Sequence, residues 1–455
     1  MARAWPAFVV VAALWSSAGA AQTMHNPDDD PDRYGIINPS IATSLPYRGD
    51  FNSARQRLSD RGITYVLNYT NDILANVSGG LRRGTINQGK LEAIFRADLE
   101  KLAGWSGLSF YANAFAIHNT GRIRRDYVGG INTIAAIEAS PTVRLSELWL
   151  EQKILGDVAS LRAGQLALDT EFFFSDTSLM FLQSDWPTIT AQNLPSGGPA
   201  YPLSTPGLRL KVDPTKDVSL LFALVNGDPA GACAGDPDTC NRYGVNFRVN
   251  DPPLVMGEAQ WRTNYGKTDA GLARQIKVGA WAHAGRFPDQ RFASDGTSLA
   301  NPASNGIAVM HRGDWGLYGV LDQQLYRPAG ASPDGGISIF AIGSISPSNQ
   351  NMIDAYLSGG IVFAGLIASR PDDRFGASFI HARFSDRLRA FDRDSILFGT
   401  GPGFVRDHET NLELSYVAQI VPGWVVQPNI QYVWHPSGRP GTHAQVIGLR
   451  TMLRY

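Results

Sequence analysis

The sequence predicts an all-β fold: a transmembrane antiparallel β-barrel of about sixteen strands, with a short N-terminal helix and an inward-folded long loop. Two observations carry this prediction. Apolar and polar residues alternate along many short segments, a period that places successive side chains on opposite faces of a strand. After residues 1–20, no apolar run reaches the roughly 20 residues that a spanning helix needs. In lipid every backbone N–H and C=O has to be paired, so a spanning sheet must close on itself.

The N-terminus has the features of a secretory signal. Arg3 precedes the apolar run FVVVAALW, and Ala18 and Ala20 supply the small residues of an A-x-A cleavage site. Residues 1–20 are therefore expected to be removed on export. A membrane anchor is the alternative, but the run is much shorter than a spanning helix. Residues 21–50 are polar and rich in Pro and Asp, and they predict a flexible leader.

The remaining chain, residues 51–455, is expected to form one barrel domain. It opens with a helix, because Phe51, Ala54 and Leu58 recur at helical spacing and Gly62 follows as a stop. Alternating segments follow to the end of the chain. The expected strands are 63–72, 91–100, 107–117, 143–154, 159–168, 207–213, 217–226, 254–264, 275–284, 314–326, 337–345, 352–366, 375–384, 409–420, 424–434 and 443–455.

The two faces of these segments differ in polarity. In residues 409–420, for example, Leu412 and Leu414 share one face while Asn411 and Glu413 share the other. The apolar face is expected to meet lipid, and the polar face to line an aqueous lumen. This arrangement is the reverse of a soluble barrel, whose apolar face points inward.

The connections also alternate in length. They tend to be short after even-numbered strands, as at 155–157, 214–216 and 421–423, and long after most odd-numbered strands, with 169–206 the longest and 346–351 an exception. An even number of strands with short turns at one end and long loops at the other is typical of barrels in Gram-negative outer membranes. The sequence therefore predicts that location, reached through the N-terminal signal.

The end of the chain supports closure of the barrel. In VIGLRTMLRY, Leu449, Thr451, Leu453 and Tyr455 fall on one face of an extended strand. Tyr455 is expected in the periplasmic aromatic girdle, and the terminal strand resembles the signal read by the outer-membrane assembly machinery. Expected partners are therefore outer-membrane lipid and that machinery.

Composition excludes several classes of function. The formal net charge is −1 and charged residues are 18% of the chain, below the usual level of about 25%, so nothing points to nucleic acid. The sequence has no G-x-S-x-G, H-E-x-x-H, C-x-x-C or P-loop motif. Its eight histidines show no ligand spacing, and GTGPGF at 399–404 is interpreted as a loop. We therefore expect no enzyme activity, no cofactor and no metal, with a barrel hydrolase or a purely structural barrel as the alternatives.

Two cysteines, Cys233 and Cys240, lie in CAGDPDTC. In an oxidising compartment they are expected to form a disulfide that staples a loop. Free thiols or metal ligation are the alternatives, although the spacing matches no common zinc pattern.

Several stretches of the chain, in order, resemble the carbohydrate-selective porins of the porin B (OprB-like) family. They are RLSELWLEQKI, LRAGQLALDTEFFF, PAYPLSTPGLRLKV, VNGDPAG, GVNFRVNDPPLVMGEAQW, VLDQQLYRP, ISPSNQN, GLIASRPDDRFG and ETNLELSYVAQIVPGWVVQPNIQYVWHPSG. The resemblance covers roughly residues 50–455. It implies a sixteen-stranded barrel through which glucose and related small carbohydrates diffuse passively into the periplasm. Selectivity among sugars varies within the family and is not implied.

Passive passage needs a narrow site that binds its solute weakly. Glu147, Trp149 and Glu151 are the best local candidates, because they place two carboxylates on either side of an aromatic ring on one strand face. Carboxylates accept hydrogen bonds from sugar hydroxyls, and a ring packs on the C–H face of a pyranose. The alternative is that these glutamates only pair with lumen arginines such as Arg162 or Arg209.

The 169–206 connection is too long for an idle loop. Folded inward, it would place Asp169, Glu171, Asp185 and Trp186 near the narrowest point; the alternative is a loop that caps the outer rim. Further lumen-facing candidates, each expected to be a solvated wall residue rather than a sugar contact, are Arg96, Glu258, Arg262, Asp322, Gln324, Asp354 and Tyr356.

A general porin, or one for anions such as sugar acids, is the alternative within the same class. It would be favoured if basic residues dominated the narrowest point. Neither a monomer nor a homotrimer is preferred by any feature of the sequence.

Overall fold

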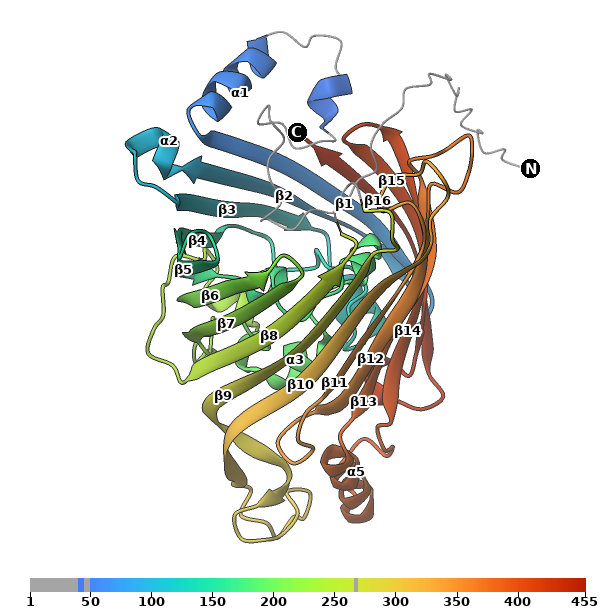
Figure 1. Ribbon diagram of the computed structural model, residues 1–455. Helices are drawn as coiled ribbons and strands as arrows, with labels where there is room; N and C mark the ends of the chain where they lie inside the picture. Colours follow the sequence, from blue (N-terminus) through green and yellow to red (C-terminus); the bar gives the residue numbers. More distant parts are fainter. Residues whose placement is uncertain (1–39, 45–49, 266–268) are drawn as a thin grey trace, which may run out of the picture.

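The computed structural model describes residues 40–44, 50–265 and 269–455, in which sixteen antiparallel strands close into a barrel with β1 beside β16 (Figure 1). The expected signal peptide and most of the expected leader lie outside the described residues. The strands are β1 (Ile63–Gly79), β2 (Gly84–Asp98), β3 (Leu108–Asn119), β4 (Thr142–Ile154), β5 (Ala159–Leu166), β6 (Thr205–Thr215), β7 (Val218–Asn226), β8 (Pro253–Thr263), β9 (Arg274–Ala293), β10 (Ala308–Tyr326), β11 (Gly336–Ile345), β12 (Ile353–Ala364), β13 (Arg374–Phe384), β14 (His408–Val421), β15 (Trp424–Trp434) and β16 (His443–Arg454).

The expected fold class is confirmed, and each expected strand coincides with an observed one. The largest differences are in the hairpins β1–β2 and β9–β10, which extend well beyond their expected ends. Residues 73–90 are rich in Gly and Asn, which are typical of loops. They nevertheless continue the ladder as far as the pair Asn76 and Gly84, because pairing along the neighbouring strand compensates for weak local preference.

The short helices occupy the connections. They are α1 (Asp50–Asp60), α2 (Leu99–Ala103), α3 (Thr188–Asn193), α4 (Pro237–Cys240) and α5 (Asp386–Phe398), together with single turns η1 (Ile41–Ser44), η2 (Ile123–Val128), η3 (Leu168–Thr170), η4 (Thr177–Met180), η5 (Pro195–Gly197) and η6 (Pro436–Gly438). No helix among the described residues is both long and apolar enough to cross a membrane.

The two ends of the barrel differ, as the connection lengths predicted. The C-terminus, α1, α2 and the short turns after β4, β6 and β14 lie at one end, and the long connections with α5 lie at the other (Figure 1). The sequence interpretation missed α5, although its ends are marked. The Ser385 side chain accepts a hydrogen bond from the Leu388 N–H, and Gly399 closes the helix at a φ of 68°.

The strand faces have the expected polarity. On β14, Leu412 and Leu414 are 37% and 50% exposed on the outer surface, whereas Glu413 between them is fully buried. The apolar band therefore faces outward and the polar residues face inward, as a lipid-embedded barrel requires.

The expected inward-folded loop is present. The β5–β6 connection, with η3, η4, α3 and η5, lies inside the barrel, where Figure 1 shows α3 within the wall. Its side chains Phe172, Phe173 and Ile189 form one buried cluster with the wall residues Trp281 and Tyr318. The β3–β4 connection also turns inward, which the sequence interpretation did not anticipate. The molecule's apolar core thus lies between loop and wall.

Backbone hydrogen bonds between Tyr455 and Leu67 complete the closure of the barrel. The Tyr455 N–H donates to the Leu67 carbonyl at 2.8 Å, and the Leu67 N–H donates to the Tyr455 carbonyl at 2.9 Å. Helix α1 packs over this seam through Arg55, whose guanidinium lies 4.4 Å from the ring centre of Tyr65 and 4.6 Å from that of Tyr455.

Candidate functional site

Four buried charges form a closed cluster on the inner wall where the β5–β6 loop begins. Arg162 pairs with Glu151 at 2.8 Å and with Glu171 at 3.2 Å, and Arg209 pairs with the same carboxylates at 3.1 and 2.8 Å. The arginine side chains are 2% and 0% exposed, and the glutamates 14% and 6%. Arg162 and Arg209 stand directly opposite each other on β5 and β6. The two carboxylates therefore offset the repulsion between the two guanidinium groups.

Trp149 connects this cluster to the neighbouring strands. Its ring stacks on Tyr111 of β3, with centroids 4.5 Å apart, and the Arg162 guanidinium of β5 lies 3.7 Å from its centre. Arg96 of β2 lies 5.6 Å from the Tyr111 ring. Cation, ring, ring and cation therefore follow one another across β2 to β5, in a row that cation–π attraction favours.

Glu147 has a different environment. A shift in the β3–β4 register beside it places both Ser146 and Glu147 in the buried layer. Its carboxylate accepts the Ala167 N–H at 3.3 Å, where the loop leaves β5. The structure thus brings together Glu147, Trp149, Glu151, Arg162, Glu171 and Arg209, six of the expected site residues.

Wall side chains hold the rest of the loop across the lumen. Glu258 accepts the Phe173 N–H at 2.9 Å, and Asp322 accepts the Thr177 N–H at 3.0 Å. Such backbone donors have no strand or helix partner, so a buried carboxylate is an effective substitute.

Two glutamates of β14, which the sequence interpretation placed on the polar face without a role, hold the middle of this loop and the β3–β4 loop. Glu413 accepts the N–H groups of Leu182 and Gln183 at 2.8 and 2.9 Å. Glu409 accepts the Asn132 N–H of the β3–β4 loop at 2.7 Å. Side-chain alternation indicated that both glutamates face inward, but no sequence signal identified the loop amides that they bind.

Asp169 and Asp185 lie within the loop itself. Asp169 accepts the Tyr201 N–H at 2.8 Å, and Asp185 accepts the Thr133 hydroxyl at 3.2 Å, which joins the two inward loops. Burial raises the pKa of Asp169 to about 6 and that of Asp185 to about 7, the latter also through the charge of Asp169. Trp186 is buried and donates to the Phe172 carbonyl at 3.2 Å.

The other expected wall residues are dispersed. Arg262 donates to Gln260 at 3.0 Å, and Asp354 pairs with Arg383 at 2.9 Å near the start of α5. Gln324 donates to the Gly335 carbonyl in the β10–β11 turn, and Tyr356 is buried in the core between loop and wall. The Cys233 and Cys240 sulfurs are joined in a disulfide within the β7–β8 loop.

One group of inward-facing residues keeps part of its surface exposed. The side chains of Lys90 and Glu92 on β2 are 17% and 18% exposed and 4.0 Å apart. Glu92 also accepts hydrogen bonds from Asn113 at 2.9 Å and Asn68 at 3.3 Å. Other partly exposed residues facing the lumen from β1, β2 and β16 include Asn68, Thr70, Ile94, Arg96, Met452 and Arg454.

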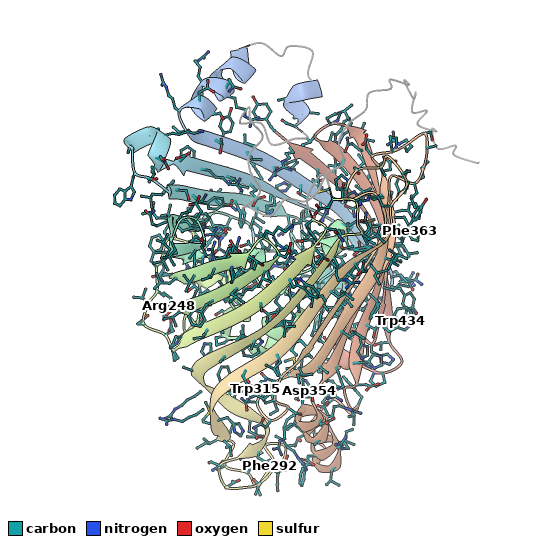
Figure 2. All side chains as sticks on the ribbon, in the orientation of Figure 1. Arg248, Phe292, Trp315, Asp354, Phe363 and Trp434 are labelled. Carbon is teal, nitrogen blue, oxygen red and sulfur yellow. A yellow bond between two sulfur atoms is a disulfide. The ribbon has the colours of Figure 1, made fainter. Side chains whose placement is uncertain are left out.

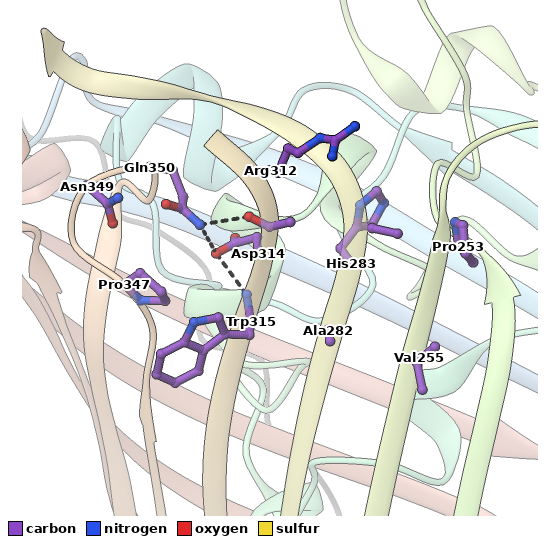
Figure 3. Close-up of a pocket in the computed structure, with 12 residues that line it drawn as sticks. Pro253, Val255, Ala282, His283, Arg312, Asp314, Trp315, Pro347, Asn349 and Gln350 are labelled. Carbon is purple, nitrogen blue, oxygen red and sulfur yellow. Dashed lines mark hydrogen bonds between the residues drawn. The ribbon is translucent and has the colours of Figure 1, made fainter. Parts of the chain in front are cut away.

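A cavity of about 520 Å³ lies elsewhere, on the outer wall near the long loops (Figure 3). Its lining includes Val255, Ala282 and Trp315, which alternate with inward-facing residues of β8, β9 and β10. Figure 3 shows Gln350 and Trp315 around Asp314, to which both donate at 2.9–3.0 Å. Because this cavity opens outward, it is not part of a path through the lumen.

The chain is similar to known proteins along most of its length. Residues 82–455 match the family described as "Carbohydrate-selective porin, OprB family". Porin B of Pseudomonas aeruginosa is 23% identical over 416 residues, covering 86% of this chain and 87% of that protein. The putative porin QuiX of Acinetobacter baylyi is 21% identical over 430 residues, covering 90% and 92%. The high-pH structure of Pseudomonas putida OprB superposes with a TM-score of 0.77 at 20% identity, covering 90% of this chain and 97% of that one.

Proposed function

Because the chain belongs to the OprB family of carbohydrate-selective porins and is thus a sugar diffusion channel of the outer membrane, we propose that glucose and related small sugars cross it along the wall formed by β16, β1 and β2. Residual exposure is the observation that carries this proposal. The inward loop covers the wall from β5 to β15, where most inward-facing side chains are buried, whereas partly exposed ones gather on β1, β2 and β16.

The chemistry of this wall suits a sugar. Glu92 and Lys90 offer an acceptor and a donor side by side, and Asn68 adds an amide. Lys90 lies 4.7 and 4.9 Å from the ring centres of Phe115 and Tyr201. Hydroxyl groups can exchange between such partners at little cost, which gives the weak binding that passage needs.

The four-charge cluster is proposed to act at the edge of this path. Glu151 is its most exposed member. Its carboxylate is therefore the part of the cluster that would accept a hydrogen bond from a sugar hydroxyl. Trp149 contacts Tyr111 and Arg162 closely. Its indole N–H is buried and has no hydrogen-bond partner among the described residues.

A channel for anions such as sugar acids is a second candidate, favoured by one observation. On the partly exposed wall, Lys90, Arg96 and Arg454 face Glu92 as the single carboxylate, since Asp98 at the end of β2 caps α2. Three cations to one anion give a field that attracts a carboxylate solute.

Other features of the sequence remain proposals. We propose that residues 1–20 direct export, that the assembly machinery binds the strand ending at Tyr455, that the protein has no catalytic activity, and that it acts as a monomer or homotrimer.

Uptake by liposomes containing the refolded protein tests the sugar path. Glucose is compared with arabinose, a disaccharide, gluconate and an amino acid of similar size. We expect glucose to enter several-fold faster than the amino acid, and Glu92→Gln or Trp149→Ala to narrow that difference. Asp157→Asn, in an exposed turn, is the matched control. Entry by size alone would contradict sugar selectivity, and gluconate faster than glucose would favour the anion channel.

A further inference from the structure

Four of the eight histidines gather on the outer wall at the end that carries the long loops. His381 lies on β13, His408 begins β14, and His435 and His443 flank the β15–β16 turn. The ring centres of His381 and His408 are 4.9 Å apart, and those of His408 and His435 are 4.7 Å apart. Trp434, next to His435, projects from the outside of the barrel (Figure 2). This group lies outside the lumen and has no place in solute passage.

Two of these histidines and a neighbouring aspartate can bind one ion. Asp407, His408 and His435 each offer a ligand atom, and these atoms lie within 4.8 Å of one another. Around a metal with bonds of about 2.1 Å, tetrahedral ligand atoms lie roughly 3.4 Å apart, so small side-chain rotations suffice. Two imidazoles and one carboxylate form a donor set that suits zinc, nickel or copper rather than magnesium or calcium.

The backbone holds these ligands in place. The Asp407 N–H donates to the Gly438 carbonyl at 3.0 Å, and the His435 N–H donates to the Thr442 carbonyl at 2.9 Å. His435 itself has a φ of 52°, a conformation that places a non-glycine residue under strain. Ligands from two separate connections therefore converge without needing the ion to order them.

The polar atoms around the cluster are consistent with a bound cation. The Nδ1 atom of His435 is buried and has no hydrogen-bond partner among the described residues, a cost that a metal bond would remove. His381 is oriented through Nδ1 by the Thr410 hydroxyl at 2.8 Å, as metal-binding histidines often are. Its Nε2 is the atom that it could offer as a fourth ligand.

Two interactions compete with a metal for Asp407. Its carboxylate lies 2.9 Å from the His408 Nδ1 and 3.9 Å from Arg389. The Asp407 and His408 side chains are 45% and 29% exposed, so an ion can reach them from water at the rim.

We propose that Asp407, His408 and His435 bind one divalent transition-metal ion, zinc by preference, with His381 as a possible fourth ligand. The ion would tie the loop carrying α5 to the β15–β16 turn on the outside of the barrel. Because it binds the folded state, it would also raise the resistance of that rim to unfolding.

Isothermal titration of the refolded protein with zinc chloride tests the proposal, after removal of any polyhistidine tag, which would bind the same ions. We expect one zinc per chain. His435→Asn should weaken binding at least tenfold, and asparagine is chosen because it tolerates the left-handed backbone. Asp407→Asn is a second ligand variant, in case the first does not fold.

His443→Gln is the matched control, since His443 stacks on Tyr432 and lies outside the ligand set. It should bind zinc like the unaltered chain. Copper provides a second readout, because its electron paramagnetic resonance spectrum should show coupling to at least two nitrogens, and to one fewer in His435→Asn. Lack of zinc binding at micromolar concentration, or equal losses in His443→Gln and His435→Asn, would overturn the proposal.

Discussion

The guanidinium of Arg162 lies 3.7 Å from the centre of the Trp149 ring while its nitrogens pair with Glu151 and Glu171. One arginine thus joins an aromatic row on the wall to the first turn of the inward loop. Removing either contact of Arg162 should therefore disturb both the aromatic row on the wall and the first turn of the inward loop.

Gly164 stands directly opposite Trp149, where the neighbouring strand leaves no room for a side chain. A Cβ on Gly164 would lie 2.2 Å from the Leu148 carbonyl oxygen and 2.6 Å from the Trp149 Cα, at a backbone φ of 148°. We expect Gly164→Ala to lower the free energy of unfolding by about 1–3 kcal/mol, the usual cost of such strain. Urea unfolding in detergent measures the change. Gly257→Ala, whose Cβ would meet nothing within 4 Å, should have a much smaller effect.

Arg209→Met would leave Glu151 and Glu171 with a single arginine. Truncating one partner of a buried ion pair typically costs about 3–5 kcal/mol, because the remaining charge is left uncompensated. The double variant Arg209→Met with Glu171→Met restores charge balance and should recover much of that loss. If the double variant is the less stable of the two in urea, the charge argument is wrong.

Glu413→Gln should release the middle of the β5–β6 loop. Two backbone N–H groups would compete for one amide oxygen, and an unmet buried donor costs about 1–3 kcal/mol. We expect single-channel conductance to rise and a disaccharide to enter faster relative to glucose. Asp157→Asn serves as the control. Unchanged conductance in Glu413→Gln would mean that the remaining contacts suffice to hold the loop.

The inward loop should also respond to pH. Because burial holds the pKa of Asp185 near 7, whereas an unfolded aspartate titrates near 4, the folded chain keeps a proton that the unfolded chain loses. Stability from this group is therefore fully present below about pH 4 and falls as pH rises through 7. Between pH 5 and pH 8, the urea midpoint should fall more for the unaltered chain than for Asp185→Asn. Parallel pH profiles of the two proteins would refute this assignment.

The strands were predictable because membrane burial imposes a simple rule on each residue. Leu412 and Glu413 must face opposite media, so their order in the sequence reveals the strand. The path of the β5–β6 loop follows no such rule, because it depends on backbone N–H groups finding carboxylates on β8, β10 and β14. Capping residues did mark α5, and Ser385 with Gly399 would have identified it.

The group of histidines on the outer wall shows a second feature that the sequence could not reveal. His408 begins β14 and His435 follows β15, so no short motif of the H-E-x-x-H kind, with both ligands on one helix, links them in the sequence. Only the registers of β13, β14 and β15 bring these side chains together. The same holds for Arg96 and Trp149, which were individually predicted to face the lumen, whereas Tyr111, which lies between them, was not singled out.

The mutual hydrogen bonds of Leu67 and Tyr455 have a consequence for biosynthesis. The partner of the first strand is β16, so the sheet cannot close before β16 has been synthesised and exported. Until then both seam strands present unpaired backbone edges, which invite aggregation. A chain truncated before β16 would leave that seam open, and we expect it to be degraded in the periplasm rather than inserted.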